Sequence, residues 1–193
     1  VETYIDRGRT YVIFQTLFGR RVNDCLSRSL AYVIGRSQHR DVEVGVTDNG
    51  FYLSAEKQFN ALRAFELLKQ EDFRQVLENA IERSEVLARR FRHCAGRSLM
   101  ILRNYMGRKK KAGRMHIGSR ILFNAVKRIS DQFPILAEAR REVLEDLMDY
   151  EHAQEIIDKI IAGRTTITEM QTKTPSPFAF GLIVGGYSDV IKI

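Results

Sequence analysis

One stretch decides the fold, Thr10-Tyr-Val-Ile-Phe-Gln-Thr-Leu-Phe18, in which β-branched and aromatic residues predominate. This composition predicts a strand. Directly after it, apolar residues recur at three- and four-residue spacing, which predicts a helix over about 21–34. Residues 41–47 alternate with a period of two, Asp48-Asn-Gly50 signals a turn, and Phe51-Tyr-Leu53 resumes a strand. The first third of the chain therefore predicts a strand, a helix and a hairpin.

The remainder is mainly helical. The spacing of apolar residues predicts helices over about 56–69, 72–81, 82–106, 119–129, 134–149 and 150–162. A glycine-flanked loop is expected at 107–113, a late strand at 165–172 and an extended turn at 174–178. Together they predict an α+β fold, a small strand–helix–hairpin unit packed on a predominantly helical bundle, with the late strand returning to the sheet. The expected segments are 1–54, 55–163 and 164–193, forming one compact domain overall.

Charge is distributed unevenly along the chain. The formal net charge of the 193 residues is +7. Residues 86–130 hold thirteen Lys and Arg and no Asp or Glu, whereas residues 137–158 hold eight acidic and two basic residues. Soluble surfaces normally mix both signs. The basic block therefore indicates either a polyanionic partner or an acidic partner within the same chain.

The basic block also has a helical phase. If 82–106 is one helix, its cationic residues fall on one half and its apolar residues, among them Leu87, Phe91 and Leu102, on the other. The cationic half runs directly into the lysines of the glycine-flanked loop. Lys and Arg bind a phosphate backbone by displacing counterions, without reading sequence. The candidate nucleic-acid-binding residues are Arg89, Arg90, Arg92, Arg97, Arg103, Arg108, Lys109, Lys110, Lys111, Arg114 and Arg120.

An internal role for the same face is the alternative. The acidic residues of 137–158, which include Glu142 and Asp146, suffice to neutralise about half of it inside the fold. In that case the domain is a structural protein–protein brace with an internally paired basic face. Both alternatives stay open on the sequence alone.

Positive signs of catalysis or cofactor binding are missing from the sequence. It contains no Gly-x-x-x-x-Gly-Lys-Ser/Thr loop and no Gly-x-Gly-x-x-Gly. Its four histidines are scattered, and Cys25 and Cys94 lie in apolar contexts typical of buried, unpaired cysteines. Glu142, Asp146 and Asp149 share a helix face, which is far more often a solvated acidic face than a metal site. We therefore expect no catalytic residues, no metal and no cofactor in this segment.

Several long blocks resemble one known family, and they occur in the same order over about residues 10–190. The most characteristic is Ala88-Arg-Arg-Phe-Arg-His-Cys-Ala-Gly-Arg-Ser-Leu-Met-Ile-Leu-Arg-Asn-Tyr105. Further matching blocks are Leu17–Asp24, Thr47–Phe51, Phe133–Asp149, Thr174–Phe180 and Gly186–Val190. The chain thereby resembles the C-terminal, DEAD/H-associated domain of large helicase-related (Lhr-type) superfamily 2 ATP-dependent DNA helicases.

The resemblance implies an accessory role. Such a parent protein would move 3′ to 5′ on single-stranded DNA, with ATP and magnesium held by its RecA-like lobes rather than by this segment. The implied partners are single-stranded DNA and the RecA-like and winged-helix domains of the same chain. No membrane partner is expected, and a cytoplasmic location follows. A third candidate function, that of an independent nuclease, would require a cluster of carboxylates contributed by different helices or strands.

Overall fold

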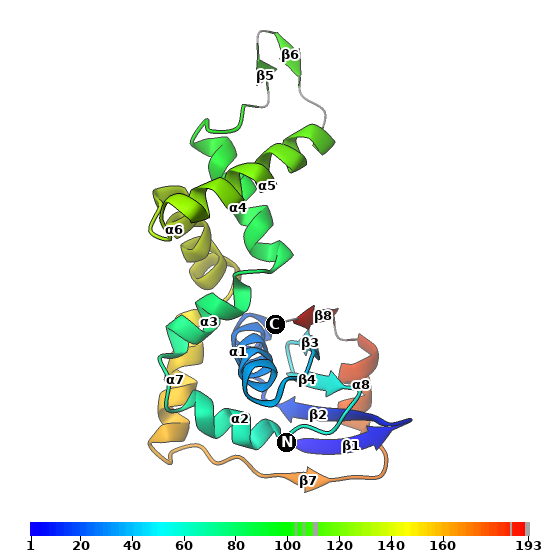
Figure 1. Ribbon diagram of the computed structural model, residues 1–193. Coiled ribbons are helices and arrows are strands. Elements are labelled where there is room, and N and C mark those ends of the chain that lie inside the picture. Colours follow the sequence, from blue (N-terminus) through cyan, green and yellow to red (C-terminus); the bar gives the residue numbers. More distant parts are fainter. Residues whose placement is uncertain (103, 106, 110–111, 186, 192–193) are drawn as a thin grey trace. The chain divides into compact units, whose positions relative to one another are not determined.

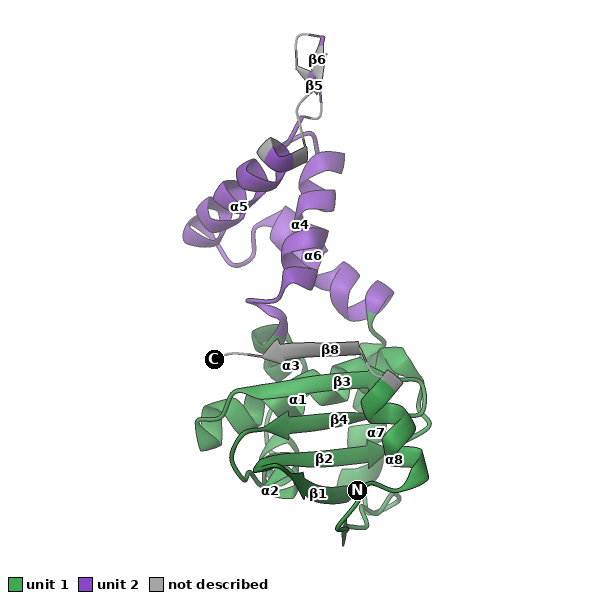
Figure 2. Cartoon of the chain, turned by 90° about the vertical axis from the view of Figure 1, so that its right-hand side faces the viewer, with its two compact units in different colours: residues 1–80, 148–193 green, residues 81–147 purple. Residues whose placement is uncertain are grey.

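The computed structural model describes residues 1–102, 104–105, 107–109, 112–185 and 187–191 (Figure 1). The chain forms two compact units, which Figure 2 colours separately. The sheet unit comprises Val1–Ala80 and Met148–Ile193, and the helical unit comprises Ile81–Leu147. Whether the chain behaves as one domain in solution stays a prediction.

The sheet unit is built on a six-stranded mixed sheet in the order β7-β1-β2-β4-β3-β8. All neighbouring strands are antiparallel except β7, which pairs parallel with β1. The strands are β1 (Glu2–Asp6), β2 (Arg9–Gln15), β3 (Val42–Thr47), β4 (Gly50–Ala55), β7 (Met170–Gln171) and β8 (Tyr187–Ile191). The α+β class, the strand–helix–hairpin order and the return of a late strand to the sheet are thus confirmed.

Helices cover both faces of this sheet. α1 (Arg20–Gln38) packs on β3 and β4, while α8 (Pro177–Gly185) lies on the opposite face, in front of the sheet in Figure 2. Because side chains alternate along a strand, Ile13 turns to α8 and its neighbour Val12 turns the other way. The remaining helices of the unit are α2 (Ala61–Leu68), α3 (Phe73–Ile81) and α7 (Tyr150–Ile161).

The sheet unit differs from the sequence-based expectation in several features, among them the unpredicted strand β8 and a later start of α2, at Ala61. A first strand, β1, precedes the predicted one and joins it through Arg7 and Gly8, both with positive φ (47° and 83°), as a tight hairpin turn requires. The late strand covers only Met170–Gln171 rather than 165–172. The segment expected as an extended turn enters helix α8 at Pro177, because proline suits the first turn of a helix.

The buried carboxylate of Glu2 joins strand β1 to the segment that precedes α8. Glu2, 2% exposed, accepts hydrogen bonds from the Ser176 backbone N (2.7 Å), the Ser176 hydroxyl (2.7 Å) and the Thr172 hydroxyl (3.1 Å). The Gln15 side-chain amide donates a fourth, at 3.3 Å. Ser176 in turn accepts from the Ala179 backbone N (3.3 Å), so it caps the N-terminus of α8. The start of α8 is therefore fixed to β1.

The helical unit carries the basic block. Its elements are α4 (Glu85–Arg97), β5 (Asn104–Tyr105), β6 (Arg108–Lys109), α5 (Ala112–Ile129), α6 (Pro134–Arg141) and the π-helical turn η1 (Glu142–Leu147). The core of the unit is formed by Leu87, Phe91, Leu136, Val143 and Leu144, all fully buried. The one helix expected over 134–149 is thus α6 followed by a π-helical turn, a distortion that often marks functional sites.

Both cysteines are free and buried, which confirms the sequence-based interpretation. Burial raises the pKa of the Cys25 thiol to about 12, so almost none of it is thiolate near neutrality. Burial also raises the pKa of Cys94. We therefore expect neither thiol to react with a maleimide until the chain is unfolded. Rapid labelling of either cysteine in the folded chain, followed by mass spectrometry, would contradict this.

Candidate nucleic-acid interface

Helix α4 positions the centre of the basic block. It begins where the Ser84 hydroxyl accepts a hydrogen bond from the Leu87 backbone N (3.2 Å), with Glu85 in the first turn. Its apolar side packs on α6 and η1 and comprises Leu87, Phe91, Cys94 and Ala95. The amphipathic phase predicted for 82–106 therefore holds over 85–97, and the opposite side carries the arginines.

The expected continuation of this helix to residue 106 is wrong. α4 ends at Arg97, and Leu99 adopts a left-handed conformation (φ 60°) that stops the helix. Leu99 and Leu102, expected to face the core, are exposed at 71% and 36%. Instead of a loop, the following segment forms the antiparallel pair β5–β6, with Gly107 at positive φ (74°) in the turn. The helical face predicted to carry the cationic residues therefore ends at Arg97.

Several of the predicted site residues cannot be placed on this surface. Arg103, Lys110 and Lys111 lie outside the described residues. The backbones of Arg108 and Lys109 belong to β6 and that of Arg114 belongs to α5, but the side chains of these three residues also lie outside the described part. Arg120 lies on α5 and is exposed. The candidate interface is therefore built from the arginines of α4.

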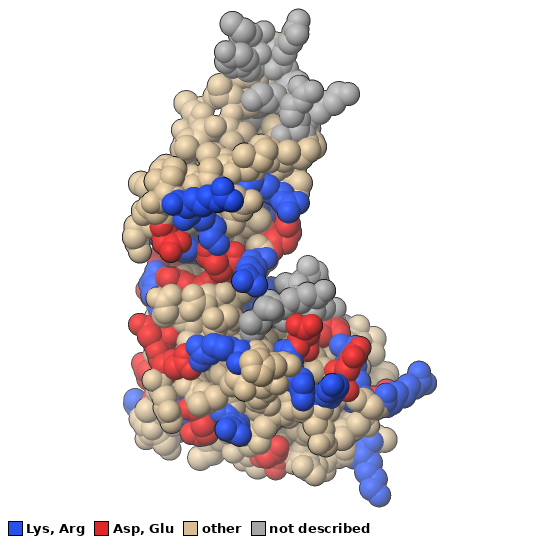
Figure 3. Space-filling model, in the orientation of Figure 1, with Lys and Arg blue, Asp and Glu red and all other residues tan. Residues whose placement is uncertain are grey.

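A groove of about 640 Å³ runs along the cationic side of α4. It is lined by Val86, Arg89, Arg90, His93, Gly96, Arg97 and Leu147. Arg89 and His93 are exposed, and within the described part of the chain Arg89 has no ion-pair partner. The space next to Gly96 is empty, because a Cβ at this position would have no atom within 4 Å. The groove thus combines an unpaired guanidinium, an imidazole and two further arginines around an open space. In this part of the molecule Figure 3 shows Lys and Arg side chains with acidic ones beside them.

The two further arginines share one buried carboxylate. Glu142, at the start of η1, is 3% exposed and accepts hydrogen bonds from Arg97 and, at 3.4 Å, from Arg90. The hydrogen bond to Glu142 raises the pKa of Arg97. The Arg97 side chain nevertheless stays 62% exposed, so only part of its guanidinium is used by the pair. Internal pairing by the acidic stretch is therefore real, and on α4 it involves these two arginines.

Arg92 points to a different neighbour. Its Nη1 donates to His116 Nδ1 on α5 at 2.5 Å. Because a guanidinium has no acceptor, this bond requires an unprotonated Nδ1 on His116. Arg92 therefore joins α4 to α5 and does not line the groove. Nothing in the sequence distinguishes Arg92 from Arg89 or Arg90, because all three lie on the same side of α4.

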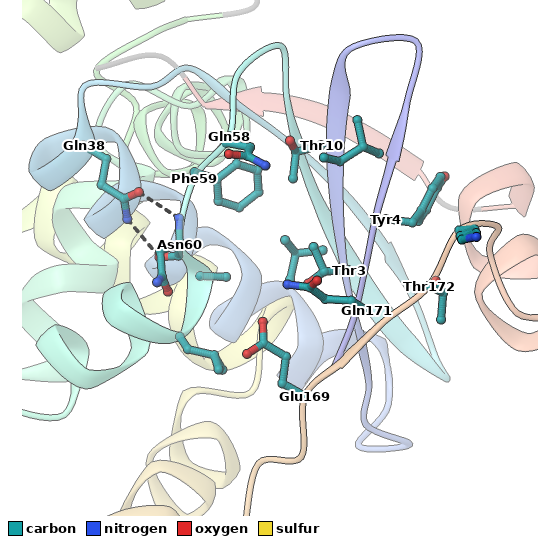
Figure 4. Close-up of a pocket in the computed structure, with 15 residues that line it drawn as sticks. Thr3, Tyr4, Thr10, Gln38, Gln58, Phe59, Asn60, Glu169, Gln171 and Thr172 are labelled. Atoms are coloured by element: carbon teal, nitrogen blue, oxygen red, sulfur yellow. Dashed lines mark hydrogen bonds between the residues drawn. The ribbon is translucent and has the colours of Figure 1, made fainter.

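A second concavity, of about 740 Å³, lies in the sheet unit and is shown in Figure 4. Thr3 and Thr10 line it from β1 and β2, and Phe59 from the segment before α2. The Gln38 side-chain amide is satisfied within this pocket, since it exchanges two hydrogen bonds of 2.9 Å with the Asn60 backbone. One acid and one base, Glu169 and Lys173, also line it. Without a cationic excess, this pocket is less suited to a phosphate backbone than the groove on α4.

The described residues lack two further kinds of feature. They contain no group of three or more His, Cys, Asp or Glu side chains placed to hold a metal ion, and Glu142 is engaged by arginines. In the same ranges, no helix has the length and apolar character that a membrane span needs.

Comparison with known proteins gives consistent results. Residues 1–179 match the sequence model of the family described as DEAD/H associated. The ATP-dependent helicase Lhr-Core of Methanothermobacter thermautotrophicus is 52% identical over 96% of this chain and 22% of its own length. The Lhr-Core helicase of Saccharolobus solfataricus is 42% identical over 99% of this chain and 22% of its own length.

A solved structure has the same fold. The helicase Lhr of Mycobacterium smegmatis, bound to ssDNA and AMP-PNP, aligns with a TM-score of 0.79 at 27% identity, over 94% of this chain and 23% of that one. The chain thus spans less than a quarter of the length of these relatives.

Proposed function

The chain belongs to the DEAD/H-associated family, and on this basis we propose that it is the accessory C-terminal domain of an Lhr-type, 3′–5′ ATP-dependent DNA helicase. We further propose that its helical unit contacts single-stranded DNA. The similarity to Lhr-Core helicases over nearly the whole chain supports the first part. The single-stranded DNA held by the similar Mycobacterium smegmatis helicase supports the choice of nucleic acid.

The observation that carries the proposal is the open groove on α4. Arg89 presents a guanidinium there that has no ion-pair partner among the described residues, and Arg97 is largely exposed despite its bond to Glu142. Cations that are not neutralised within the fold release counterions when they meet phosphates, which gives affinity without sequence preference. The groove therefore suits a domain that binds single-stranded DNA of any sequence while the helicase moves along it.

The domain contributes no ATP site in this proposal. Its sequence has no phosphate-binding loop, so ATP and Mg²⁺ belong to the RecA-like lobes of the longer protein. We expect the chain alone neither to bind nor to hydrolyse ATP. Magnesium-dependent turnover by a clean preparation, measured as phosphate release, would overturn the accessory role.

Titration of single-stranded DNA at several salt concentrations tests the nucleic-acid contact. With fluorescein-labelled oligo-dT, the logarithm of the association constant should fall linearly with the logarithm of salt concentration, by about 0.7 for each phosphate neutralised. Arg89→Ala should flatten this slope by about 0.7 and weaken all sequences alike. Replacing Lys109, Lys110 and Lys111 together by Ala should flatten it by up to roughly 2.

The matched control is Arg63→Ala, which removes the same charge from an exposed position on α2 in the sheet unit. It should leave the slope unchanged. If Arg89→Ala behaves like Arg63→Ala, the groove does not bind the phosphate backbone.

The structural brace remains the second candidate, favoured by the pairing of Arg90 and Arg97 with buried Glu142. The Arg97→Ala variant distinguishes the structural brace from the DNA-binding domain. A lower melting temperature with an unchanged salt slope would identify Arg97 as a purely structural residue. A flatter slope would place it among the residues that contact DNA.

A further inference from the structure

We propose that the outer face of α8 is a docking surface for another domain of the longer helicase chain. The proposal rests on the proposed function only in taking this chain to be part of such a longer protein. The groove on α4 and its contact with DNA play no part in it, so the two proposals can fail separately.

The composition of α8 is the first observation. Its sequence, Pro177-Phe-Ala-Phe-Gly-Leu-Ile-Val-Gly185, contains no polar side chain. One side packs on the sheet, where Ala179 and Leu182 are buried. The other exposes Phe178, Phe180 and Val184 by 80%, 60% and 71%. A helix that is apolar on all sides normally lies inside a protein, whereas a surface helix carries a polar outer face.

The second observation is that α8 is held firmly in this orientation. Its inner face contacts Tyr4, Ile13 and Tyr52 of the sheet. Its N-terminus is fixed by Ser176, whose backbone N and hydroxyl both donate to buried Glu2. These contacts prevent the helix from turning its phenylalanines inward. The exposed apolar face is therefore a fixed feature of the fold, and such a face marks an interaction site.

The length of the relatives identifies the occupant. This chain corresponds to 22% of the Lhr-Core helicases that it resembles, so most of such a protein lies outside the structure described here. A phosphate backbone is a poor occupant, because the face carries no charge to neutralise it. A neighbouring domain of the same chain, present at high effective concentration, is the partner that an apolar face suits.

Accessibility of a thiol placed on the face tests the proposal. Val184→Cys introduces the probe on the exposed side of α8, and Glu151→Cys introduces a control on the exposed, charged side of α7. Both are made in the 193-residue chain and in the full-length helicase. Maleimide labelling is followed over time by mass spectrometry of the peptide that holds each probe.

In the 193-residue chain we expect both probes to react rapidly. In the full-length helicase we expect the thiol at 184 to react at least about tenfold more slowly than the thiol at 151, and to recover after denaturation. Equal rates for the two probes in the full-length protein would overturn the proposal. So would protection at 184 that appears in the 193-residue chain as its concentration rises, because a second copy would then be the occupant. Protection that needs added single-stranded DNA would also overturn it.

A double substitution provides an independent readout. Phe178→Ser with Phe180→Ser should leave the melting temperature of the 193-residue chain nearly unchanged, because both side chains are exposed. In the full-length helicase the same change should expose new protease-sensitive sites around α8 in limited proteolysis. An unchanged cleavage pattern in the full-length protein would contradict docking at this face.

Discussion

Replacing Phe91 by alanine should lower the free energy of unfolding of the helical unit by about 3 to 5 kcal/mol, the range for a buried phenylalanine. The Phe91 side chain is fully buried on the apolar side of α4. Its ring meets Phe123 of α5 edge-on, with centroids 5.0 Å apart and planes at 76°. The substitution therefore removes both buried apolar area and an aromatic contact worth about 1 kcal/mol beyond it.

Because the chain has two units, the effect should be measured locally. Native-state hydrogen exchange of the α4 amides reports the opening of the helical unit, whereas amides of β2 and β4 report the sheet unit. We expect the first set to lose protection and the second to keep it. Phe178→Ala is the matched control, since its ring is 80% exposed, and it should change neither set. A loss below about 1 kcal/mol at α4 would show that Phe91 is not a core residue.

Glu142→Gln should have opposite effects on stability and on DNA binding. The substitution keeps the shape of the side chain but removes a buried negative charge that two arginines share. Because the Glu142 carboxylate is buried but both arginines are partly exposed, we expect the free energy of unfolding to fall, by less than a fully buried ion pair would lose. At the same time Arg90 and Arg97 lose the negative charge that neutralises them, although the glutamine oxygen can still accept a hydrogen bond, and they become more available to phosphates.

The salt dependence of binding should then become steeper, by up to about 1.4 for two additional phosphate contacts on a single strand. Denaturant unfolding and oligo-dT titration of one preparation measure both effects. Glu138→Gln is the control, because the Glu138 side chain is 45% exposed, pairs with Arg141 and does not line the groove. A stability loss with an unchanged slope would favour the brace, and no stability loss would contradict the buried pairing.

Local patterns predicted most of the fold. The apolar spacing that buries Leu87 and Phe91 lies within one helix, and the alternation of β3 lies within one strand, so neither depends on distant residues. The end of α4 was not predicted, because apolar residues recur by chance at helical spacing beyond Arg97 while the backbone turns at Leu99. Strand β1 was missed because its pairing depends on the Arg7–Gly8 turn, and arginine is an unusual residue at positive φ.

The candidate site was predicted less completely. The unmixed basic block drew attention to α4, and the acidic stretch raised the possibility of internal pairing. The eight acidic residues of that stretch look alike in sequence, however, and only the packing of η1 against α4 selects Glu142 as the buried one. In the same way, tertiary structure alone directs Arg92 to His116 and leaves Arg89 in the groove.

The hydrogen bonds between Glu2 and Ser176 also limit when the sheet unit can fold during synthesis. The two residues are 174 positions apart, so the sheet unit cannot complete its hydrogen bonds until the segment from Glu2 to Ser176 has left the ribosome. Closing so long a loop is slow, because its entropic cost precedes the contacts that offset it. The helical unit, a continuous segment from Ile81 to Leu147, depends on no such closure and is free to fold first during synthesis. Until β7 is synthesised, the outer edge of β1 stays unpaired and available to other nascent chains, so this edge can promote aggregation during the interval between the two strands.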